Sequence, residues 1–145
     1  MREFADIRVG EPLGTRSHTP DNVELFLYNA AIWNAHRIHF DQKYAMREEG
    51  YPGIVIDGPL QGDWLAQIVM EWIGDGARLE RFEFSNRRAA YVGETLVARG
   101  RVSGKDAETG EVTLEVELRN AAGEVVTPGS AVVSFANEAR RSAAP

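Results

Sequence analysis

Two of the chain's three histidines, His36 and His39, lie in one short polar segment, NAHRIHFD, which begins at Asn34 and ends at Asp41. Imidazole has an ordinary pKa of about 6.5, so it takes and gives protons near neutral pH. A neutral histidine beside a polar group can hold a water molecule and activate it. The same pair also fits a structural role, in which both rings bond backbone groups of an irregular loop. The third histidine, His18, lies in a strand-like stretch and is interpreted as structural.

A second candidate site is the tripeptide Asp57-Gly58-Pro59, which directly precedes a strongly helical pattern. The first N–H groups of a helix have no partner within the helix, and the helix dipole adds positive charge there. Glycine at this point lets a carbonyl oxygen approach, as an oxyanion site for an enolate-like transition state requires. The alternative is an ordinary helix start that needs a tight turn, with Asp57 as its electrostatic N-terminal partner.

Arginines supply the remaining candidate contacts. Arg37, Arg87 and Arg88 are candidates for binding phosphates, although each one singly also fits a solvated surface position. His36 and His39 provide two metal ligands and no third is evident, so we expect no metal site.

The elements that must position these groups follow from hydrophobic periodicity. The pattern predicts a core helix from Pro59 to Ile73, ended by Gly74, with a wide apolar face. Two further helices are expected before it, at about 20–34 and at 42–49, the second capped by Asp41. The apolar set of the first of these comprises Val23, Phe26, Leu27, Ala30, Ala31 and Trp33.

Alternating strands dominate the second half of the chain. Period-two runs with turn residues between them predict strands at 78–85, 95–102, 111–119 and 124–136, with a break in the last one expected at Pro128-Gly129, and a short strand at 13–19. One wet face on such strands indicates an antiparallel sheet, whose apolar face needs a cover. The expected class is therefore α+β, with the sheet packed on and curved around the core helix.

Length and composition restrict the remaining possibilities. The chain has 145 residues, no cysteine and a net charge of −6. We expect one domain over residues 1–138 and a frayed tail over residues 139–145. The acidic balance argues against nucleic acid as a partner. No signal-peptide or membrane-spanning pattern is evident, and together with the lack of cysteine this favours a cytoplasmic protein.

Four sequence pieces together resemble the MaoC-like hot-dog family, in particular its mitochondrial-type 3-hydroxyacyl-thioester dehydratases and mesaconyl-CoA hydratases. The pieces are the loop 34–41, Tyr44-Ala45, the segment 49–53 (EGYPG) and Gly58-Pro59-Leu60. The resemblance runs roughly from Phe26 to Leu65. It implies a hot-dog fold, a curved antiparallel sheet wrapped around one long helix, usually in a dimer or pseudo-dimer.

The resemblance also implies roles for individual residues. The family's hydratases hold water with an Asp and a His on the loop, positions that correspond to Asn34 and His39. We therefore expect His39 to transfer the proton and Asn34 to orient the water, with His36 as a second acid/base or a loop brace. The family's oxyanion donor corresponds to the Gly58 N–H. Relatives often carry His where this chain has Asp57, which could disfavour enolate charge, select a polar acyl group or point away.

The leading hypothesis is a reversible enoyl-thioester hydratase/3-hydroxyacyl-thioester dehydratase acting on acyl-CoA or acyl-ACP, without a cofactor, as a homodimer or a heterodimer with another hot-dog chain. In this hypothesis Arg37, Arg87 or Arg88 meets the pantetheine or nucleotide phosphates and Asp57 contributes to substrate binding. Two alternatives remain. One is a non-catalytic partner subunit that binds acyl thioesters, and the other is a thioesterase with Asp63 or Glu71 on the core helix as its base.

Overall fold

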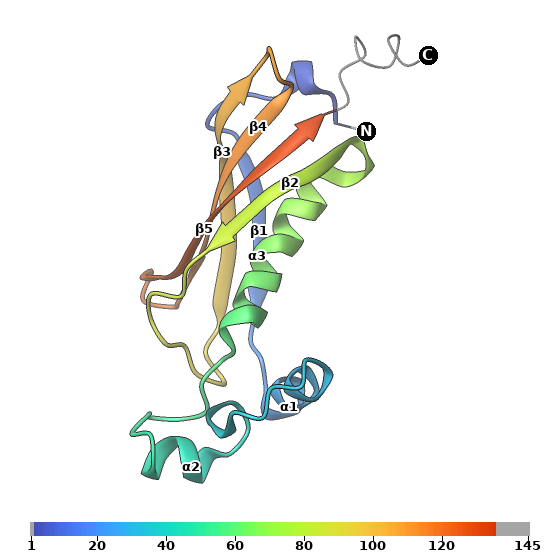
Figure 1. Ribbon diagram of the computed structural model, residues 1–145. Helices are drawn as coiled ribbons and strands as arrows, with labels where there is room; N and C mark the ends of the chain where they lie inside the picture. The colour runs from blue at the N-terminus through green and yellow to red at the C-terminus, as the bar shows by residue number, and fades with distance from the viewer. Residues whose placement is uncertain (1, 136–145) are drawn as a thin grey trace.

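A single long helix organises the structure, a computed structural model that describes residues 2–135 (Figure 1). This helix, α3 (Gly58–Ile73), confirms the core helix predicted from the sequence, and it begins one residue earlier than expected. Its apolar positions face the sheet because they recur at the helical period. The buried apolar residues of α3 are Leu60, Trp64, Leu65, Ile68, Val69, Trp72 and Ile73.

The sheet that α3 covers is antiparallel throughout, in the order β1-β3-β4-β5-β2. Its strands are β1 (Pro12–His18), β2 (Ala77–Phe84), β3 (Leu96–Asp106), β4 (Glu111–Arg119) and β5 (Val125–Phe135). All five predicted strands are present, and the α+β class is confirmed. β5 runs unbroken through Pro128 and Gly129, because Pro128 needs no N–H bond there and its carbonyl accepts from Ser85 N at 3.0 Å.

Two short helices lie beyond the sheet, beside the first turn of α3: α1 (Asn22–Ala31) and α2 (Gln42–Arg47) (Figure 1). Asp21 caps α1 by accepting from Val23 N and Glu24 N, and Asp41 caps α2 by accepting from Tyr44 N. The 3₁₀ turn Arg37–His39 lies between these helices. The loop with the two histidines is thereby held at the entrance of α3.

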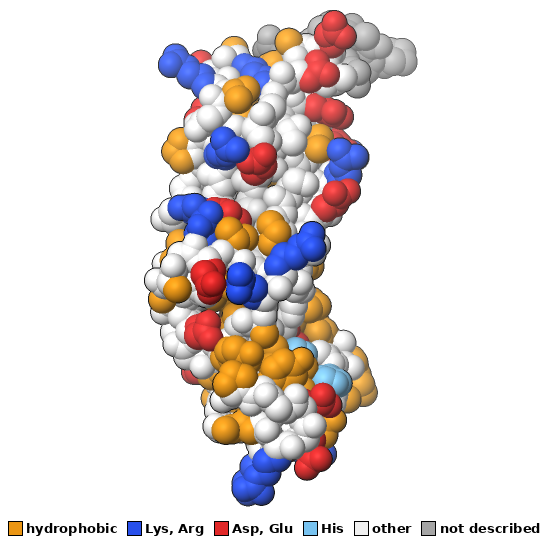
Figure 2. All heavy atoms as spheres, turned by 90° about the vertical axis from the view of Figure 1, so that its left-hand side faces the viewer, with side chains coloured by type: hydrophobic (Ala, Val, Ile, Leu, Met, Phe, Trp, Pro, Cys, Tyr) orange, Lys and Arg blue, Asp and Glu red, His pale blue; other side chains and the backbone are white. Residues whose placement is uncertain are grey.

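The apolar face predicted for the first helix is exposed in the structure. Val23, Phe26 and Leu27 are 63%, 58% and 60% exposed, and Leu25 and Asn29 are the residues that α1 buries. Helical periodicity identified the apolar stripe correctly, but it cannot tell which stripe the rest of the chain covers. Figure 2 shows histidine side chains among apolar ones at this end of the molecule.

Two observations complete the description of the chain. Within residues 2–135, no helix is long and apolar enough to cross a membrane. The tail predicted at 139–145 lies outside the described residues.

Candidate active site at the entrance of the central helix

A left-handed turn places Asn34 at the site. Helix α1 ends at Ala31, and Trp33 then takes a φ of 57°, the one positive φ of a non-glycine residue among residues 2–135. The chain turns back, so that Asn34 N donates to the Asn29 carbonyl oxygen at 3.0 Å. This closure is a Schellman-type helix end, in which glycine usually occupies the left-handed position. Trp33 occupies it here with 94% of its surface exposed.

The backbone of Val55 fixes His39. The Val55 N–H donates to the Ile38 carbonyl at 3.0 Å, and the Val55 carbonyl oxygen lies 2.8 Å from His39 Nδ1. A carbonyl oxygen only accepts, so Nδ1 carries the hydrogen. The other ring nitrogen, Nε2, is then the acceptor in the neutral ring. The side chain is 13% exposed, which makes His39 a partly shielded base with its lone pair in a fixed direction.

Asp57, which is completely buried, lies next to that lone pair. Its Oδ1 is 3.6 Å from His39 Nε2 and accepts from Asn34 Nδ2 at 3.2 Å. Its Oδ2 accepts from Asn29 Nδ2 at 2.9 Å. Burial raises the pKa of Asp57, against the opposing effects of His39 and of the two amides. Three side chains thus converge on one buried carboxylate.

Gly58 follows Asp57 as the first residue of α3. A Cβ added there would lie 2.1 Å from Asn86 Nδ2, so the Asn86 side chain approaches the helix entrance as only glycine permits. Asn86 is held by Thr127, whose Oγ1 lies 3.1 Å from Asn86 Oδ1. The helix entrance is therefore a close-packed polar corner.

The remaining predicted site residues lie around this corner. His36 is exposed, its ring is centred 5.9 Å from that of His39, and its backbone N–H donates to Asn34 Oδ1 at 3.1 Å. Arg37 pairs with Asp41 at 2.7 Å and stacks on Tyr44. Arg87 and Arg88 are exposed and directly follow Asn86, and Arg88 lies 3.5 Å from Glu124.

The two carboxylates considered as thioesterase bases have surface partners. Asp63 accepts from the Tyr28 hydroxyl at 3.0 Å, and Glu71 pairs with Arg16. Within residues 2–135, no three His, Asp or Glu side chains gather as a metal site would require.

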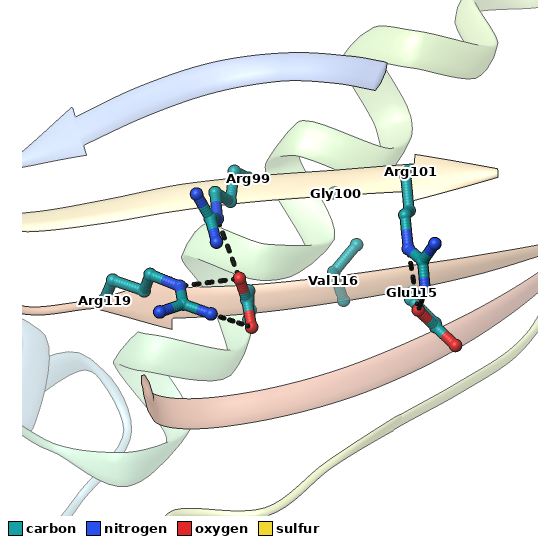
Figure 3. Close-up of a pocket in the computed structure, with 7 residues that line it drawn as sticks. Arg99, Gly100, Arg101, Glu115, Val116 and Arg119 are labelled. Atoms are coloured by element: carbon teal, nitrogen blue, oxygen red, sulfur yellow. Dashed lines mark hydrogen bonds and ion pairs between the residues drawn. The ribbon is translucent and has the colours of Figure 1, made fainter. Parts of the chain in front are cut away.

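A separate pocket of about 440 Å³ lies on the outer face of the sheet (Figure 3). Its lining residues are Arg99, Gly100, Arg101, Glu115, Val116, Glu117 and Arg119. The charged side chains stand on β3 and β4 with α3 on the far side of the strands, and they pair with one another. No histidine lines this pocket.

Asn29 is a site residue that the sequence did not reveal. It is 3% exposed and donates to the Leu25 carbonyl at 2.8 Å as well as to Asp57. A polar residue four positions after Leu25, on one face of a short helix, is the signal that was available. That signal was obscured because the opposite, apolar face was expected to be the buried one.

Comparison with solved structures defines the class of protein. The fold matches that of the (R)-hydratase from A. caviae involved in PHA biosynthesis, with a TM-score of 0.83 and 18% identity over 90% of this chain and 98% of that one. It also matches the ChsH1-ChsH2 complex from Mycobacterium tuberculosis, with a TM-score of 0.79 and 19% identity over 89% of this chain and 98% of that one. These matches show that the chain has the hot-dog fold, as the sequence resemblance implied.

The similarity in sequence covers a smaller part of the chain than the similarity in fold. The family model described as hydroxyacyl-thioester dehydratase type 2 matches residues 7–92, more than half of the chain. The chain belongs to this family.

Two curated relatives match part of the chain. The mesaconyl-C(4)-CoA hydratase of Chloroflexus aurantiacus is 51% identical over 57 residues, which cover 39% of this chain and 19% of the relative. The mitochondrial hydroxyacyl-thioester dehydratase type 2 of Schizosaccharomyces pombe is 34% identical over 83 residues, 54% of this chain and 26% of the relative. The matched segments thus span roughly a fifth to a quarter of these relatives.

Proposed function

We propose that this chain is an enoyl-thioester hydratase/3-hydroxyacyl-thioester dehydratase, which adds water reversibly to the 2,3 double bond of an acyl thioester. The observation that carries the proposal is the orientation of His39. The Val55 carbonyl takes the Nδ1 hydrogen, so Nε2 is an acceptor at the entrance of α3, close to Gly58. Family membership and the names of the relatives support the reaction class.

The reaction follows from these positions. Water gives a proton to His39 Nε2 while its oxygen bonds to C3, and the C2=C3 electron pair moves onto the thioester carbonyl as an enolate. The Gly58 N–H stabilises the oxygen that gains charge. Return of the proton from Nε2 to C2 completes the addition, and dehydration reverses these steps. Asn34 orients the water with the second hydrogen of its Nδ2, and His36 braces the loop or serves as a second acid/base.

The test offers crotonyl-CoA and mesaconyl-CoA to the purified chain and follows loss of enoyl absorbance. Turnover is expected, with a loss of about 10²–10⁴-fold in His39→Ala. Arg101→Ala, on the outer face of the sheet, is the matched control with unchanged rate. Full activity in His39→Ala, or no turnover of any thioester in a broad panel, contradicts the proposal. Release of free thiol instead indicates the thioesterase alternative.

The substrate carrier and the assembly belong to the same proposal. Arg37, Arg87 and Arg88 are proposed to contact the phosphates of CoA or of a carrier-protein pantetheine. Asp57 is proposed to act within the substrate-binding end of the site. Comparing crotonyl-CoA with crotonyl-ACP, in the wild type and in Arg87→Ala/Arg88→Ala, separates the two carriers by their KM values.

The exposed stripe of α1 favours a second candidate, a hot-dog chain that works together with another. Val23, Phe26 and Leu27 leave an apolar surface that a partner would cover. We propose a homodimer or a heterodimer, consistent with the structural neighbour ChsH1-ChsH2, which is a complex. Light scattering of the purified chain tests for the homodimer. Activity that appears only after mixing with a second hot-dog chain supports the heterodimer, and full activity alone excludes that need.

A further inference from the structure

The inference concerns the carboxylate beside His39, and it rests on the hydratase function proposed above. Among residues 2–135, no arginine or lysine pairs with Asp57, and His39 is the one basic side chain within 4.0 Å of its carboxylate. A buried carboxylate without a permanent cation is costly. A buried titratable group with one specific charge partner is a candidate for a role at a functional site.

The geometry supplies a positive charge that forms only transiently. In the neutral ring, the lone pair of His39 Nε2 lies 3.6 Å from Asp57 Oδ1, a separation too long for a direct hydrogen bond. When Nε2 takes a proton from water, a positive charge forms at salt-bridge distance from a buried negative one. Charge attraction in such a shielded place is stronger than in water. The carboxylate therefore favours the protonated state of His39 over the resting one.

The surrounding amides hold the carboxylate in position. Asn34 Nδ2 donates to Oδ1 and Asn29 Nδ2 donates to Oδ2. The side chain of Asp57 does not cap its own helix, although aspartate at this position usually does. Asp57 is turned away from the free N–H groups of α3 and toward His39, which leaves the Gly58 N–H available to a substrate oxygen.

We propose that Asp57 is the positioning carboxylate of this site: it stabilises the imidazolium form of His39, and Asn29 and Asn34 clamp its two oxygens. The carboxylate beside His39 is thus supplied from the start of the central helix, and Asn34 in the loop holds it in place. The Asn34 side chain has the further hydrogen needed to orient the water.

The test removes the negative charge from position 57 and then places it at position 34. In Asp57→Asn the carboxylate is lost, and in Asp57→Asn/Asn34→Asp the two side chains are exchanged. The exchange reverses the hydrogen bond between positions 34 and 57 but keeps it, and it keeps one carboxylate near His39. We expect Asp57→Asn to lower kcat at least about 30-fold with KM changed less than about threefold. The exchanged variant should recover at least about tenfold of that loss.

A second measurement detects the interaction between Asp57 and His39 without depending on enzymatic activity. Carboxyl ¹³C NMR follows the titration of Asp57 in the wild type and in His39→Ala. Because His39 lowers the pKa of Asp57, His39→Ala should move that titration upward. His36→Ala is the matched variant that should leave the Asp57 titration unchanged.

Each outcome has one meaning. An upward shift of the Asp57 titration together with recovery in the exchanged variant supports the assignment. An unmoved titration, or an exchanged variant as slow as Asp57→Asn while both fold with wild-type circular dichroism, overturns it. If the wild type turns over no thioester, the proposed function fails, whereas the NMR titration still decides whether Asp57 and His39 act as a pair.

Discussion

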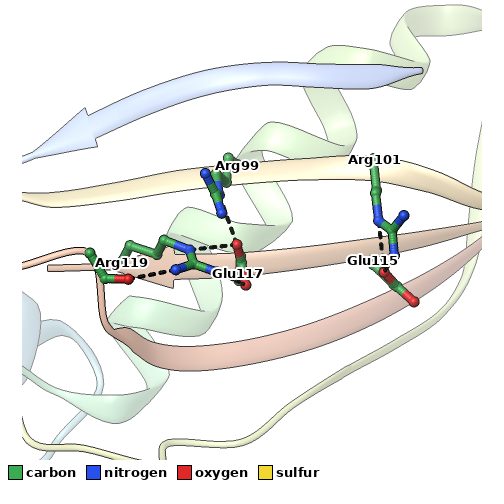
Figure 4. Close-up of polar contacts among 6 residues, drawn as sticks. Arg99, Arg101, Glu115, Glu117 and Arg119 are labelled. Atoms are coloured by element: carbon green, nitrogen blue, oxygen red, sulfur yellow. Dashed lines mark hydrogen bonds and ion pairs between the residues drawn. The ribbon is translucent and has the colours of Figure 1, made fainter. Parts of the chain in front are cut away.

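Two carboxylates in this molecule are surrounded by nitrogen donors, and their surroundings differ in kind. Glu117, on the outer face of the sheet, lies between two arginines, with Arg99 Nε and Arg119 Nε both at 2.7 Å from its Oε1 (Figure 4). Asp57, at the entrance of α3, has two neutral amides and one histidine. Glu117 is 26% exposed, and Asp57 is fully buried.

The two pKa directions are opposite for a physical reason. Burial is the largest influence on both groups and disfavours the charged form. At Glu117 the hydrogen bonds and charges of Arg119 and Arg99 outweigh it, so the pKa falls. At Asp57 the histidine and the amides do not outweigh it, so the pKa rises. Permanent cations keep a carboxylate charged in a structural role. Neutral amides and a titratable partner leave its charge able to change with its surroundings.

The largest stability effect is expected where the buried carboxylate loses a donor. Asn29→Ala removes the hydrogen bond to Asp57 Oδ2 and should cost about 1–3 kcal/mol of unfolding free energy. Because the pKa of Asp57 is already raised in the folded state, the stability linked to it is greatest at low pH and declines as pH rises through the folded pKa. Without the Asn29 amide the pKa of Asp57 rises further, so the loss of unfolding free energy in Asn29→Ala should grow with pH.

Urea unfolding at about pH 5 and about pH 8 measures this difference. Asn22→Ala, at an exposed position of the same helix, is the control and should show no such pH dependence. Equal losses from Asn29→Ala at both pH values would show that Asp57 is not the group affected.

The next effect concerns the turn that delivers Asn34 to Asp57. Trp33 has a φ of 57°, a conformation that costs a non-glycine residue about 1 kcal/mol. Trp33→Gly should therefore stabilise the fold by up to about 1 kcal/mol, since the exposed ring contributes little packing. Trp33→Ala removes the same ring but keeps the strain, so its melting temperature should stay below that of Trp33→Gly. Equal melting temperatures for the two variants would mean that the turn stores no strain.

The sequence predicted the central helix and the sheet because their signals are periodic and mostly local. The apolar positions of α3 repeat at the helical period, and β4 alternates from Glu111 to Arg119, the same bounds that the structure has. Four of the site residues predicted from the sequence also lie together in the structure: His39 and Asn34 both approach Asp57, and Gly58 is the next residue in the chain. The assignment of catalytic roles to these residues stays a prediction until variants are measured.

What the sequence could not provide is the direction in which side chains point. Asp57 beside a helix start looked like a partner of the helix dipole or of the substrate, and its contacts with Asn29 and Asn34 depend on how α1 meets α3. The buried face of α1 depends on tertiary contacts in the same way. Periodicity locates a face, but only packing decides whether Leu25 and Asn29 or the apolar stripe turns inward.

Glu117, on the outer face of the sheet, should affect stability with pH in the opposite sense, and the effect should be smaller. Glu117→Gln removes a carboxylate whose pKa is lowered by its arginines, so its stabilisation is present above the unfolded pKa and is lost as pH falls through the folded pKa. We expect a loss of about 0.5 kcal/mol near neutral pH, discounted for partial exposure, and none in strong acid. Urea unfolding across this range, repeated in high salt, measures it, and a loss that persists in acid would contradict the account.

The smallest effect is expected one pair further along the same strands. Glu115 accepts from Arg101 Nη2 at 2.7 Å, but the two side chains are 56% and 63% exposed, and no second arginine among residues 2–135 shares the pair. Solvent and salt screen such an isolated pair, so Glu115→Gln should change the unfolding free energy by only about 0.2 kcal/mol. The comparison of Glu115→Gln with Glu117→Gln by urea unfolding isolates the contribution of a second arginine. If the two variants lose equal stability, the second arginine adds nothing to the contribution of Glu117. Exposure alone would then set how much each of these carboxylates stabilises the fold.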